Sequence, residues 1–119
     1  MDNEETTKEE AEERQKSILE ATTQAIEVPL SLAKQSLEAL EKVMFILKIG
    51  NPQTTSDSGV ACLALASGIE GAVYNVMINL SGLESKNEID SYKKESIRII
   101  SKTKDLRENI LNEVWQRIT

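Results

Sequence analysis

The chain has 119 residues, of which 39% are hydrophobic, 29% charged and 3% aromatic, which suits one domain of helices packed through aliphatic side chains. The absence of histidine and the presence of a single cysteine, Cys62, exclude histidine catalysis, histidine metal sites and intramolecular disulfides. The net charge of −6 arises in residues 1–13, where seven acids accompany one lysine. Without a basic excess, and with so few aromatic residues, the chain is not expected to bind nucleic acid.

The first predicted helix begins near Thr6 or Thr7. Each of these threonines precedes a glutamate, Glu9 or Glu10, by the three residues of a capping box. Pro29 has no amide hydrogen, so we expect it to break or kink this helix. The apolar face is expected at Ile18, Ala21, Ala25 and Val28.

A second predicted helix runs from Pro29 to Gly50. Pro29 suits the first turn of a helix, and Gly50 is expected to end it in a left-handed conformation. Asn51 precedes Pro52, which disfavours helical geometry and predicts a loop. The apolar stripe follows steps of three and four residues at Leu30, Ala33, Leu37, Leu40, Met44 and Leu47.

The third predicted helix, residues 59–80, is capped by Ser56 or Asp57 and is rich in small residues. Ala64, Gly68 and Ala72 are spaced four apart, which predicts a face that another backbone can approach closely. We expect this apolar helix to be the centre of a bundle.

The stretch from Ser58 to Leu83 is also long enough to span a bilayer. It contains Glu70 in its middle together with Asn75 and Asn79, and it has no close basic flanks. The N-terminus has neither the basic region nor the apolar run of a secretion signal. We therefore expect no membrane insertion, and the low cysteine usage favours a cytoplasmic location.

A fourth predicted helix follows a capping box formed by Ser85 and Glu88. Its apolar side is Ile89, Tyr92, Ser96, Ile99, Thr103, Leu106 and Ile110, closed by Val114, Trp115 and Ile118. The fold class is thus all-α: a single domain, residues 1–119, built as an antiparallel bundle of about four helices around the small-residue-rich helix. Part of that central helix would remain uncovered, so completion by oligomerisation or by a missing N-terminal segment is expected.

Polar residues within the most apolar helix are the first candidates for a site. Asn75 and Asn79 lie one turn apart on one face, where they either bind a ligand or bond to a loop or a second copy. Glu70 is either a buried acid suited to proton transfer or cation binding, or an exposed or salt-bridged residue.

Two further polar segments are candidates. The loop from Gly50 to Asp57 enters a helix N-terminus, where an anion or a ligand carbonyl could bind, although a turn with an N-cap is the simpler explanation. Lys94, Arg98 and Lys102 form a basic stripe that is either solvated surface or a site for a multiply anionic ligand.

Three blocks of sequence resemble the cyclodeaminase/cyclohydrolase family, which comprises the cyclodeaminase domain of formiminotransferase-cyclodeaminase and the bacterial methenyltetrahydrofolate cyclohydrolases. The blocks occur in order along nearly the whole chain. They are Glu27-Val28-Pro29-Leu30, then Gly50-Asn51-Pro52 with Ser56-Asp57 and Gly59-Val60-Ala61, then Glu70-Gly71-Ala72 with Asn75-Val76-Met77-Ile78-Asn79-Leu80.

The resemblance implies an oligomeric, all-helical enzyme, a homodimer or larger, acting on 5,10-methenyl- or 5-formimino-tetrahydrofolate without a metal. Asp57 and Glu70 are then the catalytic candidates, and Lys94, Arg98 and Lys102 the candidate contacts for an anionic folate tail. The candidates for substrate binding are Asn51, Ser56, Asn75 and Asn79.

The family also has a glycine-rich stretch, further apolar helices and a proposed catalytic acid ahead of the segment that this chain resembles. None of these has a counterpart in the sequence, so we expect either a fragment of a longer enzyme or a short homologue. The alternative function is a non-catalytic helical module for oligomerisation or folate binding.

Overall fold

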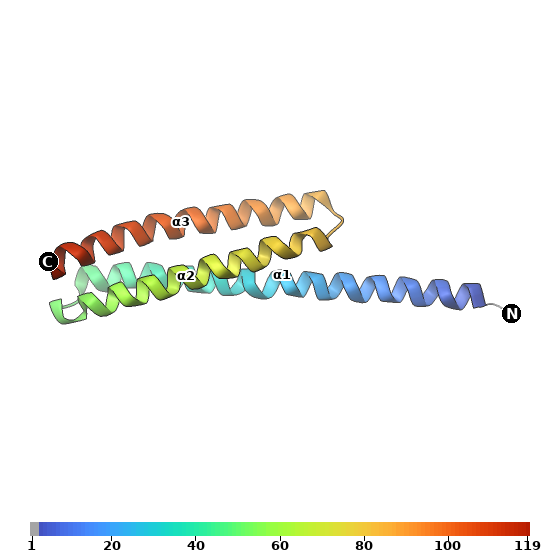
Figure 1. Cartoon of the computed structure of the whole chain (residues 1–119), viewed down its shortest axis with the longest axis horizontal. Coiled ribbons are helices and arrows are strands. Elements are labelled where there is room, and N and C mark those ends of the chain that lie inside the picture. The colour runs from blue at the N-terminus through green and yellow to red at the C-terminus, as the bar shows by residue number, and fades with distance from the viewer. Residues whose placement is uncertain (1–2) are drawn as a thin grey trace.

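The computed structural model describes the backbone of residues 3–119 and the side chains of residues 7–119. It has three long helices, α1 (Asn3–Ile49), α2 (Thr55–Asn79) and α3 (Lys86–Ile118), with the short 3-10 turns η1 (Pro52–Thr54) and η2 (Leu80–Gly82) between them. Each long helix runs antiparallel to the one before it, and α1 extends far beyond the other two (Figure 1). The molecule measures 79 × 22 × 17 Å. The all-α prediction is confirmed.

The predicted division of the first half of the chain at Pro29 is wrong, because α1 continues through this proline and the bundle has three helices, not four. Proline removes the amide that would bond to the carbonyl of Ala25. The side-chain Nδ2 of Asn79 on α2 donates to that carbonyl over 3.5 Å. Ile26 and Leu30, on either side of the proline, are 0% and 3% exposed. Tertiary packing therefore holds the helix across a residue that costs about 3 kcal/mol in a helix interior.

The first part of α1 is an arm that projects from the bundle (Figure 1). The helix begins at Asn3, ahead of the threonines predicted to cap it. Every residue from 7 to 21 is exposed, and so are Ala25 and Val28, so the predicted apolar face of this segment is wrong. Ile26 is the first fully buried residue of α1. The helical spacing of apolar residues did not predict burial here, because α1 extends beyond α2 and α3 and its side chains in the arm remain exposed.

The second part of α1 carries the predicted core stripe. Met44 in this stripe is half-buried, and the other members are buried: Leu30, Ala33, Leu37, Leu40 and Leu47. The left-handed Gly50 is not observed, because no residue in the described part of the chain has a positive φ. Its amide instead donates to the carbonyl oxygen of Ile46 over 2.6 Å, and a Cβ at Gly50 would lie 2.7 Å from that oxygen. Glycine allows this close approach.

The start of α2 also differs from the prediction. Asn51 Oδ1 accepts a hydrogen bond from the amide of Gln53 over 3.0 Å and so caps η1, which leads directly into α2. The N-cap of α2 is Thr54. Ser56 and Asp57 lie inside the first turn and do not cap the helix, because the preceding 3-10 turn moves the helix start towards the N-terminus.

α2 packs against both α1 and α3, as expected of the central helix. Gly59 lies against α3, where an added Cβ would be 2.9 Å from Val114 Cγ1. The predicted small-residue face is divided: Ala72 is buried, whereas Ala64 and Gly68 are exposed. Within the described residues one stretch, Pro52–Gly82, is long and apolar enough to cross a membrane, and 33% of its most apolar window is buried in the bundle. A core helix passes the same test.

α3 begins as predicted, with the amide of Glu88 donating to Ser85 Oγ over 3.3 Å. Its apolar side faces the core: Ser96, Ile99, Thr103 and Ile110 are buried, and Ile89, Tyr92 and Leu106 are half-buried. Near its end, Arg117 Nη1 donates to the carbonyl oxygen of Leu47 over 2.6 Å. This contact ties the C-terminus of α3 to the last turn of α1 and pairs a carbonyl near the end of that helix.

Candidate functional site

The residues predicted to bind substrate, together with Asp57, fall into two groups at opposite ends of α2. Asn51, Ser56 and Asp57 lie where α2 begins, and Asn75 and Asn79 lie where it ends. A helix rises 1.5 Å per residue, so the backbones of Asp57 and Asn75 are about 27 Å apart. One chain therefore does not bring the two groups into one site.

The group at the start of α2 has an exposed carboxylate beside a helix N-terminus. Asp57 and Ser56 are both exposed in the first turn, and in the described part of the chain no hydrogen bond or ion pair engages their side chains. The positive end of the helix dipole stabilises a carboxylate at this position. Asp57 is thus available to a cationic or proton-donating ligand, whereas the side-chain oxygen of Asn51 is used in capping η1.

The group at the end of α2 consists of two amides with different roles. Asn79 is half-buried, and its Nδ2 donates to the carbonyl oxygens of Asn75 at 2.7 Å and of Ala25 at 3.5 Å. Asn79 therefore bonds to backbone on α1 and α2, the structural alternative raised for it from sequence. The side chain of Asn75 is exposed and remains available for a ligand.

Glu70 is exposed and is therefore not the buried acid that was one of the two interpretations of its position in the sequence. It lies near the middle of α2, and Oε1 accepts a hydrogen bond from the hydroxyl of Tyr74 over 3.0 Å. This hydrogen bond and the charge of Glu70 raise the pKa of Tyr74. The pair offers a carboxylate and a phenol side by side on an open surface.

The basic stripe on α3 is only partly brought together. Lys94 and Arg98 line a groove of about 460 Å³ between α1 and α3, and Lys102 lies outside it. Arg98 donates to both carboxylate oxygens of Glu95, over 2.7 and 3.2 Å, and this contact lowers the pKa of Glu95. Lys34 of α1 also reaches Glu95, at 3.8 Å. Much of the positive charge in the groove is therefore already paired.

The same groove holds a contact that the sequence did not predict. The hydroxyl of Tyr92 on α3 donates to Glu27 Oε1 on α1 over 2.5 Å. This hydrogen bond raises the pKa of Tyr92 to about 12, with a further contribution from burial. Glu27 belongs to the block Glu27-Val28-Pro29-Leu30, but its partner 65 residues away could not be inferred from that block. The contact fixes α1 to α3 two residues before Pro29.

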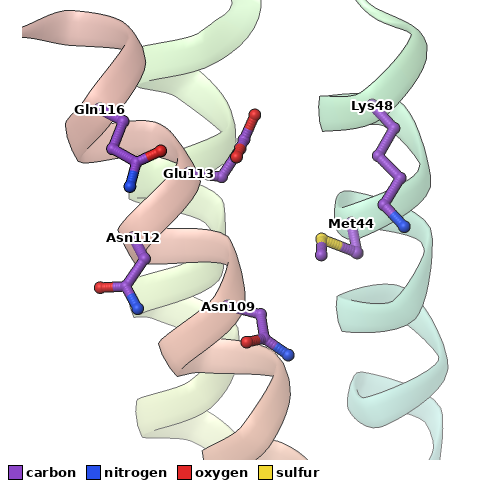
Figure 2. A pocket seen from close by; sticks show the side chains of 6 residues that line it. All are labelled: Met44, Lys48, Asn109, Asn112, Glu113 and Gln116. Carbon is purple, nitrogen blue, oxygen red and sulfur yellow. The ribbon is translucent and has the colours of Figure 1, made fainter.

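A second groove, of about 370 Å³, lies between the ends of α1 and α3 (Figure 2). Met44 points from α1 towards α3 in this view, and Lys48 lies one turn further along α1 (Figure 2). None of the predicted site residues lines this groove. Its α3 side is polar and consists of Asn109, Asn112, Glu113 and Gln116.

The described residues include neither an accessible thiol nor a cluster of side chains that could hold a metal ion. Cys62 is 0% exposed, and burial raises the pKa of its thiol despite the opposing charge of Arg107. A buried thiol of this kind is a poor nucleophile. Within the described part of the chain, no three cysteine, aspartate or glutamate side chains are grouped so that they could hold a metal ion.

Comparison with known proteins identifies the family. The formiminotransferase-cyclodeaminase family model matches residues 1–98. The chain is 30% identical to the methenyltetrahydrofolate cyclohydrolase of Methylorubrum extorquens over 112 residues, which cover 94% of this chain and 54% of that protein. It is 32% identical over 105 residues to the formimidoyltransferase-cyclodeaminase of Dictyostelium discoideum, covering 88% of this chain and 20% of that protein.

The rat formimidoyltransferase-cyclodeaminase is 36% identical over 77 residues, covering 65% of this chain and 14% of that protein. The chain therefore belongs to the family of folate-dependent cyclodeaminases and cyclohydrolases. It spans about half the length of the cyclohydrolase and a smaller part of the two cyclodeaminases. The family match includes both polar groups of α2 and ends at Arg98, so it excludes Lys102 and the α3 side of the second groove.

Proposed function

We propose that the chain acts in folate-dependent one-carbon metabolism, on 5,10-methenyl- or 5-formimino-tetrahydrofolate. The observation that carries this proposal is the similarity to a cyclohydrolase over 94% of the chain, which includes both polar groups of α2. In the hydrolytic reaction, water adds to the cationic methenyl carbon and one carbon–nitrogen bond then breaks to leave a formyl group. In the deaminating reaction, ring closure of the formimino group releases ammonia.

The residues suit these reactions because both involve a cationic carbon and proton transfer. A carboxylate can stabilise the cation and accept a proton from the attacking water, and Asp57 and Glu70 are the exposed candidates. Amide and hydroxyl groups can orient the pterin ring. The candidates for this role are Ser56 and Asn75, whose side chains are free, and Asn51 and Asn79, through the side-chain atoms that their bonds to backbone leave available. Lys94 and Lys102 are candidates for contacts to an anionic folate tail, with Arg98 shared with Glu95.

The test is the loss of methenyltetrahydrofolate absorbance as a function of protein concentration, corrected for spontaneous hydrolysis in the same buffer. We expect turnover proportional to protein and a loss of at least about tenfold in Asp57→Ala or Glu70→Ala, as for removal of an acid-base group. Asp105→Ala is the matched control, because this exposed acid on α3 lies outside the family match. Wild-type rates equal to buffer, or equal losses in all three variants, would contradict the proposal.

A non-catalytic module for oligomerisation or folate binding is the second candidate, and the apolar surface left open on α2 favours it. Val60 and Ile78 on this helix are 67% and 74% exposed. This candidate predicts a stable oligomer, a homodimer or larger, without turnover of methenyltetrahydrofolate. Protection against heat by reduced folate, without catalysis, would identify the folate-binding form. A folded monomer at high dilution would exclude the oligomerisation module.

We further propose that the protein works in the cytoplasm and not within a membrane. The single, buried cysteine suits a reducing compartment. Glu70 lies in the middle of the apolar stretch, where insertion of an acid into a bilayer costs about 2.5–3.5 kcal/mol. Fractionation of cells that express the full chain tests this location, and recovery with the membranes after a high-salt wash would contradict it.

A further inference from the structure

The glutamates whose side-chain partners the structure defines fall into two classes. Glu95 and Glu113 form salt bridges with arginines, which neutralise their charge. Glu27 and Glu70 instead accept a hydrogen bond from the hydroxyl of a tyrosine. A phenol orients a carboxylate but leaves its negative charge in place. The carboxylates of Glu27 and Glu70 therefore remain able to stabilise a cation.

The surroundings of Glu27 and Glu70 differ. Glu70 lies on an open surface of α2, whereas Glu27 lines the groove of about 460 Å³ between α1 and α3. Leu30, which is 3% exposed, gives this groove an apolar wall. Ligands bind preferentially in concave sites that combine apolar walls with a few polar groups. Glu27 is therefore better placed than Glu70 to act on a bound substrate.

The groove also joins the carboxylate of Glu27 to part of the predicted basic stripe. Glu27 and Lys34 are seven residues apart on α1, which is about 10 Å along the helix. Beyond Glu27 positive charge is in excess, because one carboxylate, that of Glu95, lies in the groove with three cations: Lys34, Lys94 and Arg98. Lys34 and Arg98 reach Glu95, whereas in the described part of the chain no hydrogen bond or ion pair engages Lys94. The groove thus has a negative end and a positive remainder.

This distribution of charge is complementary to the proposed substrate, which has a cationic carbon at its ring system and carboxylates at the end of its tail. We propose that Glu27 is a catalytic residue of the folate reaction, with the cationic carbon at Glu27 and the tail directed towards Lys94. Tyr92 is the positioning residue that holds the carboxylate of Glu27. Neither Asp57 nor Glu70 lines this groove. The inference rests on the proposed function and adds to it a carboxylate in the same groove as a candidate contact for the tail.

Glu27 can carry one proton through both steps of the hydrolysis. Tyr92 holds Oε1, and in the described part of the chain Oε2 has no partner. As water adds to the methenyl carbon, Oε2 takes one proton from the water, and the electron pair of the carbon–nitrogen double bond moves to nitrogen. When one carbon–nitrogen bond then breaks, Glu27 returns this proton to the departing nitrogen, and the hydroxyl group loses its proton to solvent as it becomes the formyl oxygen. Because the pKa of Tyr92 is raised to about 12, its hydroxyl keeps donating to Oε1 near neutral pH.

Glu27→Gln tests the catalytic role, with Glu38→Gln as the matched control. Glutamine keeps the size of the side chain and can still accept a hydrogen bond from Tyr92, but it has no charge and does not take the proton from water. Glu38 is exposed on the same helix and does not line the groove. With methenyltetrahydrofolate we expect kcat to fall at least about 100-fold in Glu27→Gln and to stay within about twofold in Glu38→Gln. The loss in Glu27→Gln should also exceed that in Asp57→Ala or Glu70→Ala.

Tyr92→Phe tests whether the tyrosine acts through Glu27. Phenylalanine keeps the ring and removes the hydrogen bond to Oε1. We expect kcat to fall by about 3- to 10-fold with KM unchanged, as for the loss of one hydrogen bond that orients a catalytic group. In the double variant Glu27→Gln, Tyr92→Phe we expect no loss beyond that of Glu27→Gln alone, because the group that Tyr92 positions no longer reacts. Losses that multiply in the double variant would overturn the positioning role.

The direction of the substrate in the groove is tested by Lys94→Gln, with Lys93→Gln as the control. Lys93 is exposed on α3 and does not line the groove. For methenyltetrahydrofolate we expect KM to rise at least about fivefold in Lys94→Gln with kcat unchanged, because a contact to the tail is made equally in the ground state and the transition state. For the methenyltetrahydropteroate analogue, which lacks the glutamate tail, KM should not change. An equal rise in KM for both compounds, or in Lys93→Gln, would overturn this orientation.

The outcomes of the hydrolysis assay separate this inference from the proposed function. Turnover by the wild type, with a kcat in Glu27→Gln within about twofold of the wild-type value, would overturn the role of Glu27 and leave the folate proposal standing. Equal losses in Glu27→Gln and Glu38→Gln would also overturn it, since they would reflect the loss of any negative charge on α1. A wild-type chain no faster than buffer would contradict the folate proposal and this inference together.

Discussion

The two halves of α1 belong to one continuous helix but are held by different forces. From Ile26 onward, buried aliphatic residues recur every three or four positions and pack against α2 and α3. From residue 7 to residue 21, every side chain is exposed. A helix of this length without packing is only marginally stable in water, so the arm depends on the packed half to begin it. Helical periodicity in a sequence therefore does not show that a face is buried.

The boundary between the two halves is fixed by three contacts within six residues. Thr22 lies against Gly82, the carbonyl of Ala25 accepts from Asn79, and Glu27 accepts from Tyr92. The contacts come from η2, α2 and α3, so both of the other long helices and the turn between them hold α1 just before Pro29. Proline is tolerated at position 29 because Asn79 of α2 donates to the carbonyl of Ala25 in place of the amide hydrogen that proline lacks.

Replacing one leucine in each half of α1 by alanine should show the largest difference in the free energy of unfolding. Leu40 is 0% exposed, so Leu40→Ala should lower the free energy of unfolding by about 2–5 kcal/mol through lost burial and a cavity. Leu19 is 48% exposed in the arm, and Leu19→Ala should change it by no more than about 0.5 kcal/mol. Urea denaturation at one fixed protein concentration measures both. Similar losses would mean that the arm is packed in solution.

A double-mutant cycle at the boundary should show a smaller effect. Asn79→Ala should cost about 1 kcal/mol, since it leaves the carbonyl of Ala25 without its donor. In Pro29→Ala the new amide can bond to that carbonyl. In this background Asn79→Ala should therefore lower the free energy of unfolding by about half as much as in the wild type. The four free energies of unfolding give the coupling directly. Equal losses in both backgrounds would show that Asn79 does not compensate for the proline.

The contact between Glu27 and Tyr92 should show the smallest effect, and only in alkaline solution. The fold raises the pKa of Tyr92 from 10.0 to about 12, so the native state retains the phenolic proton where the unfolded chain loses it. The stabilisation is complete below pH 10 and is lost as the pH rises towards 12. Tyr92→Phe should remove this part of the pH dependence of thermal unfolding. An unchanged profile in Tyr92→Phe would contradict the assignment.

The candidate site shows what sequence could supply and what it could not. Asp57 and Asn75 are exposed, and in the described part of the chain no hydrogen bond or ion pair engages their side chains. Their separation of about 27 Å follows from their spacing along one helix, which the sequence already predicted. Which faces of that helix stay exposed was decided by its packing against α1 and α3. Asn79 was selected for the same reasons as Asn75 but bonds to the carbonyl freed by Pro29.

The sequence by itself determined the helical class, the second half of α1, the capped start of α3 and the family, since these depend on local spacing and on residue identity. The number of helices, the exposure of the arm and the pairing of Glu27 with Tyr92 were decided only by the tertiary structure. The reason is physical. The sequence shows that a proline, a carboxylate or a glycine destabilises a helix or needs a partner, but the groups that contact it and offset this free-energy cost lie far away along the chain. At Gly68 and Gly71 the described part of the chain, apart from their own helix backbone and chain neighbours, places no atom within 4 Å of an added Cβ.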